Sequence, residues 1–371
     1  MTNNYNANVG NYLRNKRETL GLTQEDVASK MGIGRDAIVR LEKGTRKITF
    51  EELEKISEIY NFDIMDLING INNTNEENIK GIVLAGGSGT RLYPITEATS
   101  KQLIAIYDKP MIYYPIYVLM QANIRDILII TTPQDQSNFK RLLGDGSKYG
   151  INLTYAVQEE PKGLAQAFTI GRDFIGDNAC AMILGDNLFL GNGLDLELKE
   201  ATRNAINGAA TIFGYKVKDP ERFGIMELDS NNNVKSVEEK PEMPKSDYAI
   251  TGLYFYPKNV SEKADTIKPS KRGELEITSL NDLYLQEGKL KARLLGDGYS
   301  WFDTGTFDSM LEASNMIKTL EANKDSVVCC LEALAYEKGW LSEEKLEERA
   351  ELLKKNSYGK HLQKILKKGY R

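Results

Sequence analysis

The chain has 371 residues, of which 41% are hydrophobic and 27% charged, a composition typical of folded globular proteins. Such a length exceeds the usual size of one domain, so we expect two or more. Three cysteines, two of them adjacent, and a single histidine exclude a disulfide framework and a His/Cys zinc site, so any metal must bind carboxylates. No membrane-length apolar stretch and no apolar signal segment is present, so we expect a cytoplasmic protein.

The formal net charge is −5, from 48 basic and 53 acidic residues, which excludes a uniformly basic nucleic-acid coat. The charge is unevenly distributed. Residues 1–48 contain nine basic and five acidic residues, which leaves a net charge of +4. This segment could face phosphates.

The pattern of apolar residues divides the chain into two domains. In residues 1–68 they recur at helical spacings, interrupted by glycines, which predicts about five short helices. Residues 69–78 are rich in asparagine and poor in apolar side chains, so we interpret them as a linker. Residues 79–371 form the second predicted domain.

Two helices joined by a tight turn are predicted near the N-terminus. Thr23 is a good N-cap for a helix that turns Val27, Ala28 and Met31 inward. A glycine-containing turn then leads into a second helix over residues 35–43, which Gly44 closes.

Residues 22–44 closely resemble the phage-repressor (Cro/C1, or XRE) helix-turn-helix family, and the resemblance covers roughly residues 9–68. It implies that the second helix enters the major groove of double-stranded DNA. By position, Arg35, Asp36 and Arg40 would face bases, while Gln24 and Lys43 would anchor phosphates. The alternative is a dimerisation or docking module, because the fold alone requires the glycines and the buried positions.

Three apolar runs in the second domain alternate with helix-length stretches, at residues 81–85, 126–131 and 179–184. Continuous apolar strands between helices predict an α/β fold with a mixed, mainly parallel sheet covered on both faces, a Rossmann-like architecture. The first run leads into the loop Gly86-Gly-Ser-Gly-Thr-Arg91. Its glycines allow the backbone to approach a triphosphate, and Arg91 adds positive charge. The loop matches neither a Walker motif nor a dinucleotide fingerprint.

Further motifs follow in a fixed order. They are residues 100–103 (SKQL), 108–112 (DKPMI), 184–187 (LGDN), 237–241 (VEEKP), 251–254 (TGLY), 272–278 (RGELEIT) and 301–306 (WFDTGT). Asp186 stands at the C-terminal end of an apolar strand, where open α/β sheets collect ligands. Together, over residues 79–371, these motifs resemble the sugar-nucleotide pyrophosphorylase family, specifically the glucose-1-phosphate thymidylyltransferases.

The resemblance implies a role for each matching residue. Asp186 and Asp303 would hold Mg²⁺, which prefers carboxylate oxygens. Arg91 and Lys101 would bind the triphosphate, and Lys240 and Arg272 the phosphate of the sugar. With Asp186 and Asp303, the cations Arg91, Lys101 and Lys240 form the expected catalytic set. The sugar pocket would be lined by Gly224, Glu239, Gly252 and Tyr254. The nucleotide would also contact Leu84, Gly86, Gly87, Ser88, Gly89 and Thr90, with Gln158 and Gly163 at the base.

The implied reaction joins dTTP and glucose 1-phosphate into dTDP-glucose and pyrophosphate, a step of deoxysugar and dTDP-rhamnose synthesis. The resemblance also implies a homotetramer that a dTDP-sugar inhibits. Uridylyl transfer stays open, because residues 159–162 are variable in this family and one methyl group is worth only about 1–3 kcal/mol. A further alternative is a transcriptional regulator that senses a nucleotide sugar.

Overall fold

The computed structural model describes residues 2–60, 62, 64, 79–87, 89–324 and 326–368. The chain forms two compact units, residues 1–77 and 78–371. The expected linker of residues 69–78, and any fifth helix of the first unit that includes Leu67 and Ile68, lie outside the described residues. Among the described residues, no helix is long and apolar enough to cross a membrane.

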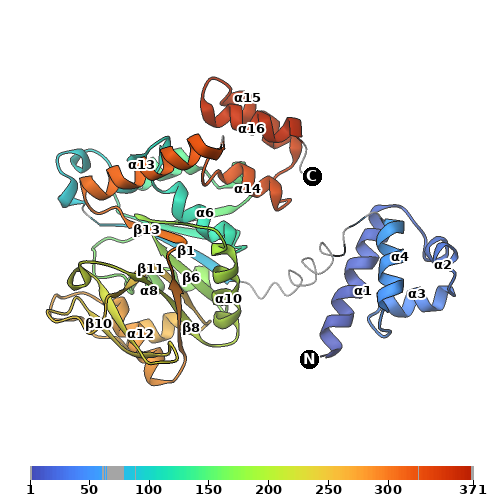
Figure 1. Ribbon diagram of the computed structural model, residues 1–371, viewed down its shortest axis with the longest axis horizontal. Helices are drawn as coiled ribbons and strands as arrows, with labels where there is room; N and C mark the ends of the chain where they lie inside the picture. Colours follow the sequence, from blue (N-terminus) through green and yellow to red (C-terminus); the bar gives the residue numbers. More distant parts are fainter. Residues whose placement is uncertain are drawn as a thin grey trace. The chain divides into compact units, whose positions relative to one another are not determined.

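The described part of the first unit is helical (Figure 1). Its helices are α1 (Thr2–Thr19), α2 (Gln24–Met31), α3 (Arg35–Glu42) and α4 (Phe50–Tyr60). Thr23 caps α2 as predicted: its hydroxyl accepts from the Asp26 backbone N–H, and the Asp26 carboxylate accepts from the Thr23 backbone N–H. Val27, Ala28, Ile38 and Leu41 form the small core with residues of α1 and α4.

Helix α1 spans 18 residues and is longer than the other described helices of this unit. Gly10 lies within it and allows close helix packing, because a Cβ there would lie 2.5 Å from the carbonyl oxygen of Leu41. The glycine is therefore a contact point between α1 and α3, and it does not end the helix.

Nine of the described strands of the second unit form one sheet. Along the path β10-β9-β11-β6-β1-β4-β5, the strands β6, β1, β4 and β5 are parallel, and β11 joins β6 antiparallel. The off-path strand β8 pairs with β11 and β12. The bounds are β1 (Ile79–Ala85), β4 (Asp126–Thr131), β5 (Asn152–Val157), β6 (Ala179–Leu184), β8 (Ala210–Lys216), β9 (Gly224–Leu228), β10 (Val234–Glu239), β11 (Tyr248–Tyr256) and β12 (Leu290–Leu295). The predicted mixed, mainly parallel sheet is confirmed.

Two hydrophobic cores cover the two faces of this sheet (Figure 1). One core contains residues of α6 (Tyr113–Gln121), α7 (Gln136–Leu143), α10 (Leu194–Ile206), α14 (Leu331–Glu337), α15 (Glu343–Leu352) and α16 (Ser357–Lys368). The other contains residues of α8 (Gln166–Ile170), α9 (Arg172–Ile175), α11 (Val260–Thr266) and α12 (Ile277–Gln286). The three cysteines are free and buried.

Smaller elements complete the second unit. Two short ladders pair β7 (Asn187–Gly191) with β13 (Tyr299–Asp303) and β2 (Ala105–Ile106) with β3 (Lys109–Pro110). The long helix α13 (Phe307–Lys324) follows β13. Single 3₁₀ turns are η1 (Thr90–Leu92), η2 (Ile95–Glu97), η3 (Lys101–Leu103), η4 (Ser147–Tyr149) and η5 (Pro220–Arg222). The β7–β13 ladder brings Asp303 next to Asn187, the neighbour of Asp186.

Candidate active site and candidate nucleic-acid interface

The candidate active site lies at the carboxyl edge of the parallel strands. Gly86 follows β1, Gln158 follows β5, and Gly185 and Asp186 follow β6. The Gly185 backbone N–H donates to the Leu84 carbonyl at 2.9 Å, which joins the loops after β1 and β6. A Cβ on Gly86 would lie 2.6 Å from Oε1 of Gln158, so the glutamine side chain rests against the glycine-rich loop. The sheet therefore collects three of the predicted nucleotide-binding elements at one edge.

The glycine-rich loop encloses a polar hollow. Gly87 and Gly89 have φ values of 99° and 59°, the left-handed region that glycine adopts without strain. The loop, Arg91, Lys101 and Gly305 line a cavity of about 220 Å³. Ser88, which we expected to bind the nucleotide, lies outside the described residues. The cavity combines backbone N–H groups and two cations, as a phosphate site requires.

Asp186 and Asp303 lie side by side. In the β7–β13 ladder Asp303 pairs with Asn187, the neighbour of Asp186. Thr304 reinforces this contact, because its backbone N–H and its hydroxyl donate to the Asp186 carbonyl oxygen at 3.1 and 2.7 Å. Residues separated by 117 positions in the chain are thus joined through one short ladder.

The two carboxylates differ electrostatically. Burial raises the pKa of Asp303, and the charge of Asp186 raises it further. Burial acts on Asp186 in the same direction, but the Lys101 ammonium, which forms an ion pair with that carboxylate, holds the pKa of Asp186 below its ordinary value. Arg91 lies beside Gly305, two residues after Asp303, since a Cβ on Gly305 would be 3.3 Å from the guanidinium nitrogens. Its charge, like that of Lys101, opposes the rise of the Asp303 pKa.

This pair of carboxylates fits a hard divalent cation. Burial, and after it the charge of Asp186, raise the pKa of Asp303, and a bound cation would favour the ionised form of both carboxylates. Among the described residues, no group of three or more His, Cys, Asp or Glu side chains could hold a metal ion. Two carboxylates are nevertheless the number with which proteins commonly hold Mg²⁺, whose other ligands are phosphate oxygens and waters.

A second cluster contains the residues expected to bind the sugar phosphate. Glu239 ends β10 opposite Gly224 of β9, and its carboxylate accepts from the Thr278 hydroxyl at 2.5 Å. Arg272 lies 3.6 Å and Lys240 3.9 Å from the same carboxylate. Both cations are almost half exposed, with side-chain exposures of 44% and 45%. They can therefore turn toward an incoming phosphate.

Arg272 is held by carboxylates of its own loop as well. Glu274 lies 3.2 Å and the buried Glu276 lies 3.7 Å from its guanidinium nitrogens. Burial, assisted by the charge of Glu239, raises the pKa of Glu276, while a hydrogen bond from Ser270 opposes the rise. Arg272 is therefore surrounded by the carboxylates of Glu239, Glu274 and Glu276.

The two clusters are linked through β11 and β13. The Gly252 backbone N–H donates to Asn187 at 3.0 Å. Tyr254 is buried; its pKa is raised by burial first and then by the charges of Glu239 and Asp186, one from each cluster. The ring of Trp301 lies 5.3 Å from that of Phe223, the residue before Gly224. The two clusters of predicted site residues are therefore connected through β11 and β13.

The two residues expected at the nucleotide base also lie on this edge. Gln158 is buried and donates to Gln166 at 2.8 Å. Gly163 has a φ of 108°, and a Cβ there would lie 2.4 Å from the Leu275 carbonyl oxygen. Backbone hydrogen bonds from Leu275 to Lys162 and from Ala165 to Leu275, at 2.7 and 3.1 Å, join this loop to the loop of Arg272.

Sequence reasoning assigned no role to several side chains that build the site. Asn187, Thr278 and Thr304 hydrogen-bond the predicted residues directly. Each stands within a motif that the sequence analysis singled out. Their contacts depend on strand pairing, which the sequence does not display.

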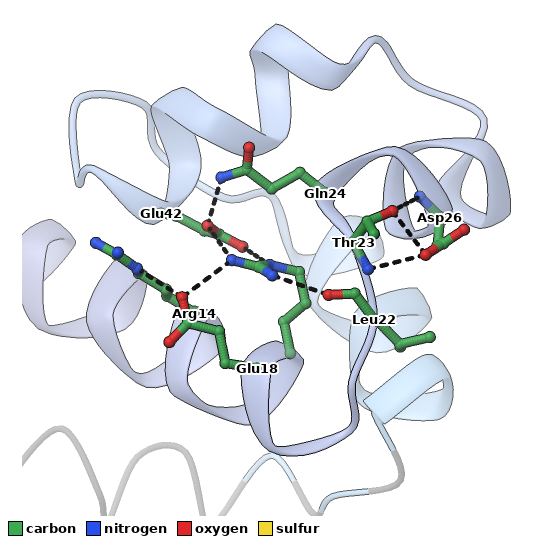
Figure 2. Close-up of polar contacts among 8 residues, drawn as sticks. Arg14, Glu18, Leu22, Thr23, Gln24, Asp26 and Glu42 are labelled. Atoms are coloured by element: carbon green, nitrogen blue, oxygen red, sulfur yellow. Dashed lines mark hydrogen bonds and ion pairs between the residues drawn. The ribbon is translucent and has the colours of Figure 1, made fainter.

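In the first unit, a buried ion pair holds the helix-turn-helix together. Arg17 of α1 donates to the two oxygens of Glu42 in α3 at 2.6 and 3.2 Å, and to the Leu22 carbonyl at 2.9 Å. Figure 2 shows Gln24 turned toward Glu42, to which its amide donates at 2.8 Å. Gln24, which we expected to anchor phosphates, therefore also ties α2 to α3.

The remaining residues expected to contact DNA lie on one exposed surface. Arg35, Asp36, Arg40 and Lys43 are exposed, whereas Ile38 and Leu41 of the same helix are buried. A hollow of about 640 Å³ lies at the start of α2, and Arg35 and Gln24 are among its lining residues. Helix N-termini and cations of this kind suit phosphate oxygens.

Comparisons with known proteins agree with both units. Residues 80–319 match the nucleotidyl transferase family and residues 13–67 match a helix-turn-helix family. The glucose-1-phosphate thymidylyltransferase of Neisseria meningitidis serogroup A is 55% identical over 290 residues, 78% of this chain and all of that protein. The enzyme of the same name from Xanthomonas campestris pv. campestris is also 55% identical, over 78% of this chain and 98% of its own.

A solved structure is similar as well. A Bacillus anthracis protein, described as a glucose-1-phosphate thymidylyltransferase and crystallised with sucrose, is 40% identical with a TM-score of 0.60. The match covers 64% of this chain and 94% of that one. The chain thus belongs to the nucleotidyl transferase family, among the glucose-1-phosphate thymidylyltransferases, and carries a fused helix-turn-helix domain.

Proposed function

We propose that the second unit transfers a thymidylyl group from dTTP to glucose 1-phosphate, releasing pyrophosphate and forming dTDP-glucose. The observation that carries the proposal is a hollow lined by the glycine-rich loop, Arg91 and Lys101, with Asp186 paired to Lys101 and Asp303 on the strand beside it. Residues that the sequence places far apart become neighbours there. A relative that is 55% identical to this chain over 290 residues bears the name glucose-1-phosphate thymidylyltransferase.

The chemistry requires two anions to approach one another. The phosphate oxygen of the sugar attacks the α-phosphorus of dTTP, and pyrophosphate leaves. Arg91, Lys101 and the glycine-rich loop would hold the triphosphate, while Lys240 and Arg272 would hold the sugar phosphate. The cations reduce the repulsion between the reactants and align them, which is the main contribution that a protein makes to phosphoryl chemistry.

Magnesium is the metal that we propose for Asp186 and Asp303. When bound, it would neutralise charge on the phosphates and on the leaving pyrophosphate. The chain's own contribution is to hold the two carboxylates adjacent, one paired with Lys101 and the other near Arg91. Before the triphosphate binds, the ion pair with Lys101 would hold the Asp186 carboxylate in place.

Gln158 and Gly163 would read the pyrimidine edge, and Gly224, Glu239, Gly252 and Tyr254 would line the sugar pocket. Glu239 is suited to accept from sugar hydroxyls, because Thr278 occupies only one of its oxygens. We propose thymine as the preferred base, which differs from uracil by one methyl group. Uridylyl transfer is the alternative that the substrate panel below distinguishes.

Pyrophosphate release tests the enzyme proposal. The full chain is incubated with Mg²⁺, glucose 1-phosphate and, separately, dTTP, UTP, ATP, CTP and GTP. We expect release to be fastest with dTTP, to require the sugar phosphate, and to be lost in Asp186→Asn. If no triphosphate yields pyrophosphate, the proposal is wrong; if UTP alone does, the uridylyl alternative replaces it.

For the first unit we propose binding to double-stranded DNA. The supporting observation is that Arg35 and Arg40 of α3 are exposed whereas Ile38 is buried, since a packing module has no need of exposed arginines at these positions. Arg can bind guanine with two hydrogen bonds, and Asp36 would accept from cytosine or hold Arg40. The competing hypothesis is a dimerisation or docking module, which predicts no retention on duplex DNA at any salt concentration.

The fusion suggests regulation and assembly, which we propose as further features. A tetramer of the enzyme unit would present paired DNA-binding units to a palindromic site, and a dTDP-sugar could alter operator affinity. Sedimentation analysis measures the assembly, and DNA titration with and without dTDP-glucose measures the coupling. If dTDP-glucose left the affinity for the operator unchanged, DNA binding and catalysis would be independent activities of one chain.

A further inference from the structure

Asn187 stands at the centre of the site, yet the proposed reaction assigns it no role. The residue follows Asp186 and starts β7. It is 2% exposed. Its side chain makes hydrogen bonds to Asp186, Gly252 and Trp301, which belong to three separate segments of the chain.

The amide group of Asn187 uses both of its ends. Nδ2 donates to Oδ1 of Asp186 at 2.9 Å. Oδ1 accepts from the Gly252 backbone N–H at 3.0 Å and from the Trp301 indole N–H at 2.7 Å. Only an amide side chain of this length can donate at one end and accept twice at the other.

These bonds orient Asp186 completely. Lys101 pairs with Oδ2 of Asp186, while Asn187 occupies Oδ1. Asn187 is also the residue opposite Asp303 in the β7–β13 ladder. The side chain of Asn187 therefore orients one carboxylate, and its backbone lies opposite the residue that carries the other.

The acceptor end reaches a different part of the site. Gly252 belongs to the sugar-pocket set, and a Cβ at that position would lie 2.6 Å from Oδ1 of Asn187. Trp301 packs its ring against Phe223, beside Gly224. The position of the Asn187 amide is thus shared between the carboxylate pair and the wall of the sugar pocket.

We infer that Asn187 is a positioning residue that orients the Asp186 carboxylate through its donor end and holds the sugar-pocket wall through its acceptor end. The inference rests on the proposed function of Asp186 and Asp303. It assigns separate effects to the two ends of one side chain. Loss of the donor disturbs the chemical step, whereas loss of the acceptor disturbs binding of the sugar phosphate.

Two substitutions separate the ends. Asn187→Asp keeps the oxygen acceptors for Gly252 and Trp301, but it removes the donor to Asp186 and places a like charge beside it. Asn187→Ala removes both ends. Pyrophosphate release gives kcat and the KM for glucose 1-phosphate, and thermal unfolding of each full-length variant measures the structural effect.

We expect Asn187→Asp to lower kcat at least tenfold while the KM for glucose 1-phosphate stays within about twofold of the unsubstituted chain. Asn187→Ala should lower kcat and also raise that KM at least fivefold. A readout without turnover is the binding of Mn²⁺ to the dTTP complex, followed by electron paramagnetic resonance, which should be at least fivefold weaker in Asn187→Ala. A matched control is Asn204→Ala, because Asn204 of α10 donates to the Thr211 hydroxyl of β8 at 3.2 Å and lies outside the site residues.

The outcomes distinguish the inference from the function on which it rests. If the unsubstituted chain releases no pyrophosphate, the proposed function fails. If that chain is active and Asn187→Asp retains its kcat, the donor end has no positioning role and the inference is overturned. It is equally overturned if Asn187→Ala changes activity and Mn²⁺ binding only in proportion to the fraction of unfolded protein.

Discussion

Arg17→Met removes the cation that neutralises Glu42 inside the helix-turn-helix unit. Both side chains of this pair are buried, with 10% of Arg17 and 4% of Glu42 exposed. Met fills a similar volume, so the change leaves a carboxylate without its partner rather than a large cavity. The hydrogen bond to the Leu22 carbonyl, which connects α1 to the start of α2, disappears with it.

The expected destabilisation is a large fraction of this unit's stability. Removing one partner of a buried ion pair costs about 3–5 kcal/mol. A helical unit of about 60 residues has a total stability of roughly 3–9 kcal/mol. Arg17→Met should therefore remove at least about a third of that stability and lower the melting temperature of the unit. The exposed pair of Arg14 and Glu18, labelled in Figure 2, provides the contrast, because such a pair contributes about 0–1 kcal/mol.

Differential scanning calorimetry and hydrogen exchange of the full chain measure the effect. Amides of α2 and α3 should lose protection in Arg17→Met and keep it in Arg14→Met, while pyrophosphate release remains unchanged in both. Retention on DNA should follow the protection. Equal protection and equal melting of the two variants would refute the reasoning, since it would show that the buried pair is worth no more than the exposed one.

Three further predictions concern charge and backbone geometry. Asp303→Asn should increase the free energy of unfolding by on the order of 1 kcal/mol in metal-free buffer at pH 7, and so raise the Tm. Burial and the charge of Asp186 raise the pKa of Asp303, so the ionised form destabilises the fold as the pH rises through that pKa. The gain should vanish below pH 3; a lower Tm at pH 7 would contradict it. Gly163→Ala should raise the KM for dTTP several-fold, since φ is 108° and Leu275 blocks the Cβ, while Gly208→Ala, where nothing lies within 4 Å, should not. Equal KM values would argue against the clash. Retention on a random duplex DNA library should fall at least tenfold between 50 and 200 mM salt, with Lys43→Ala weakening all sequences alike and Arg40→Ala relaxing sequence preference; salt-independent retention would exclude phosphate anchoring.

The elements whose signal is local could be predicted from the sequence. The apolar runs at residues 126–131 and 179–184 became β4 and β6 with the predicted bounds. The Thr23 cap and the α2 bounds likewise depend on neighbouring residues only. Helix α1 was harder, because Gly10 is a helix breaker in isolation and is explained by a contact with α3 that lies 31 residues away.

The candidate site shows the same division. Asp186 was recognisable because a carboxylate follows an apolar strand. That Asp303 lies beside it could come only from the resemblance, because the β7–β13 ladder is antiparallel and spans more than a hundred residues. The role of Asn187 needs three partners from three segments, and no spacing in the sequence indicates them.

Phosphorus NMR of the complete reaction tests the central claim most directly. With dTTP, glucose 1-phosphate and Mg²⁺, the account predicts that the triphosphate signals are replaced by the paired doublets of a sugar nucleotide and the singlet of pyrophosphate. Asp186→Asn and Asp303→Asn should each leave the dTTP signals unchanged. Conversion that continues in both variants, or hydrolysis to inorganic phosphate in place of the sugar nucleotide, would contradict a site built on these two carboxylates.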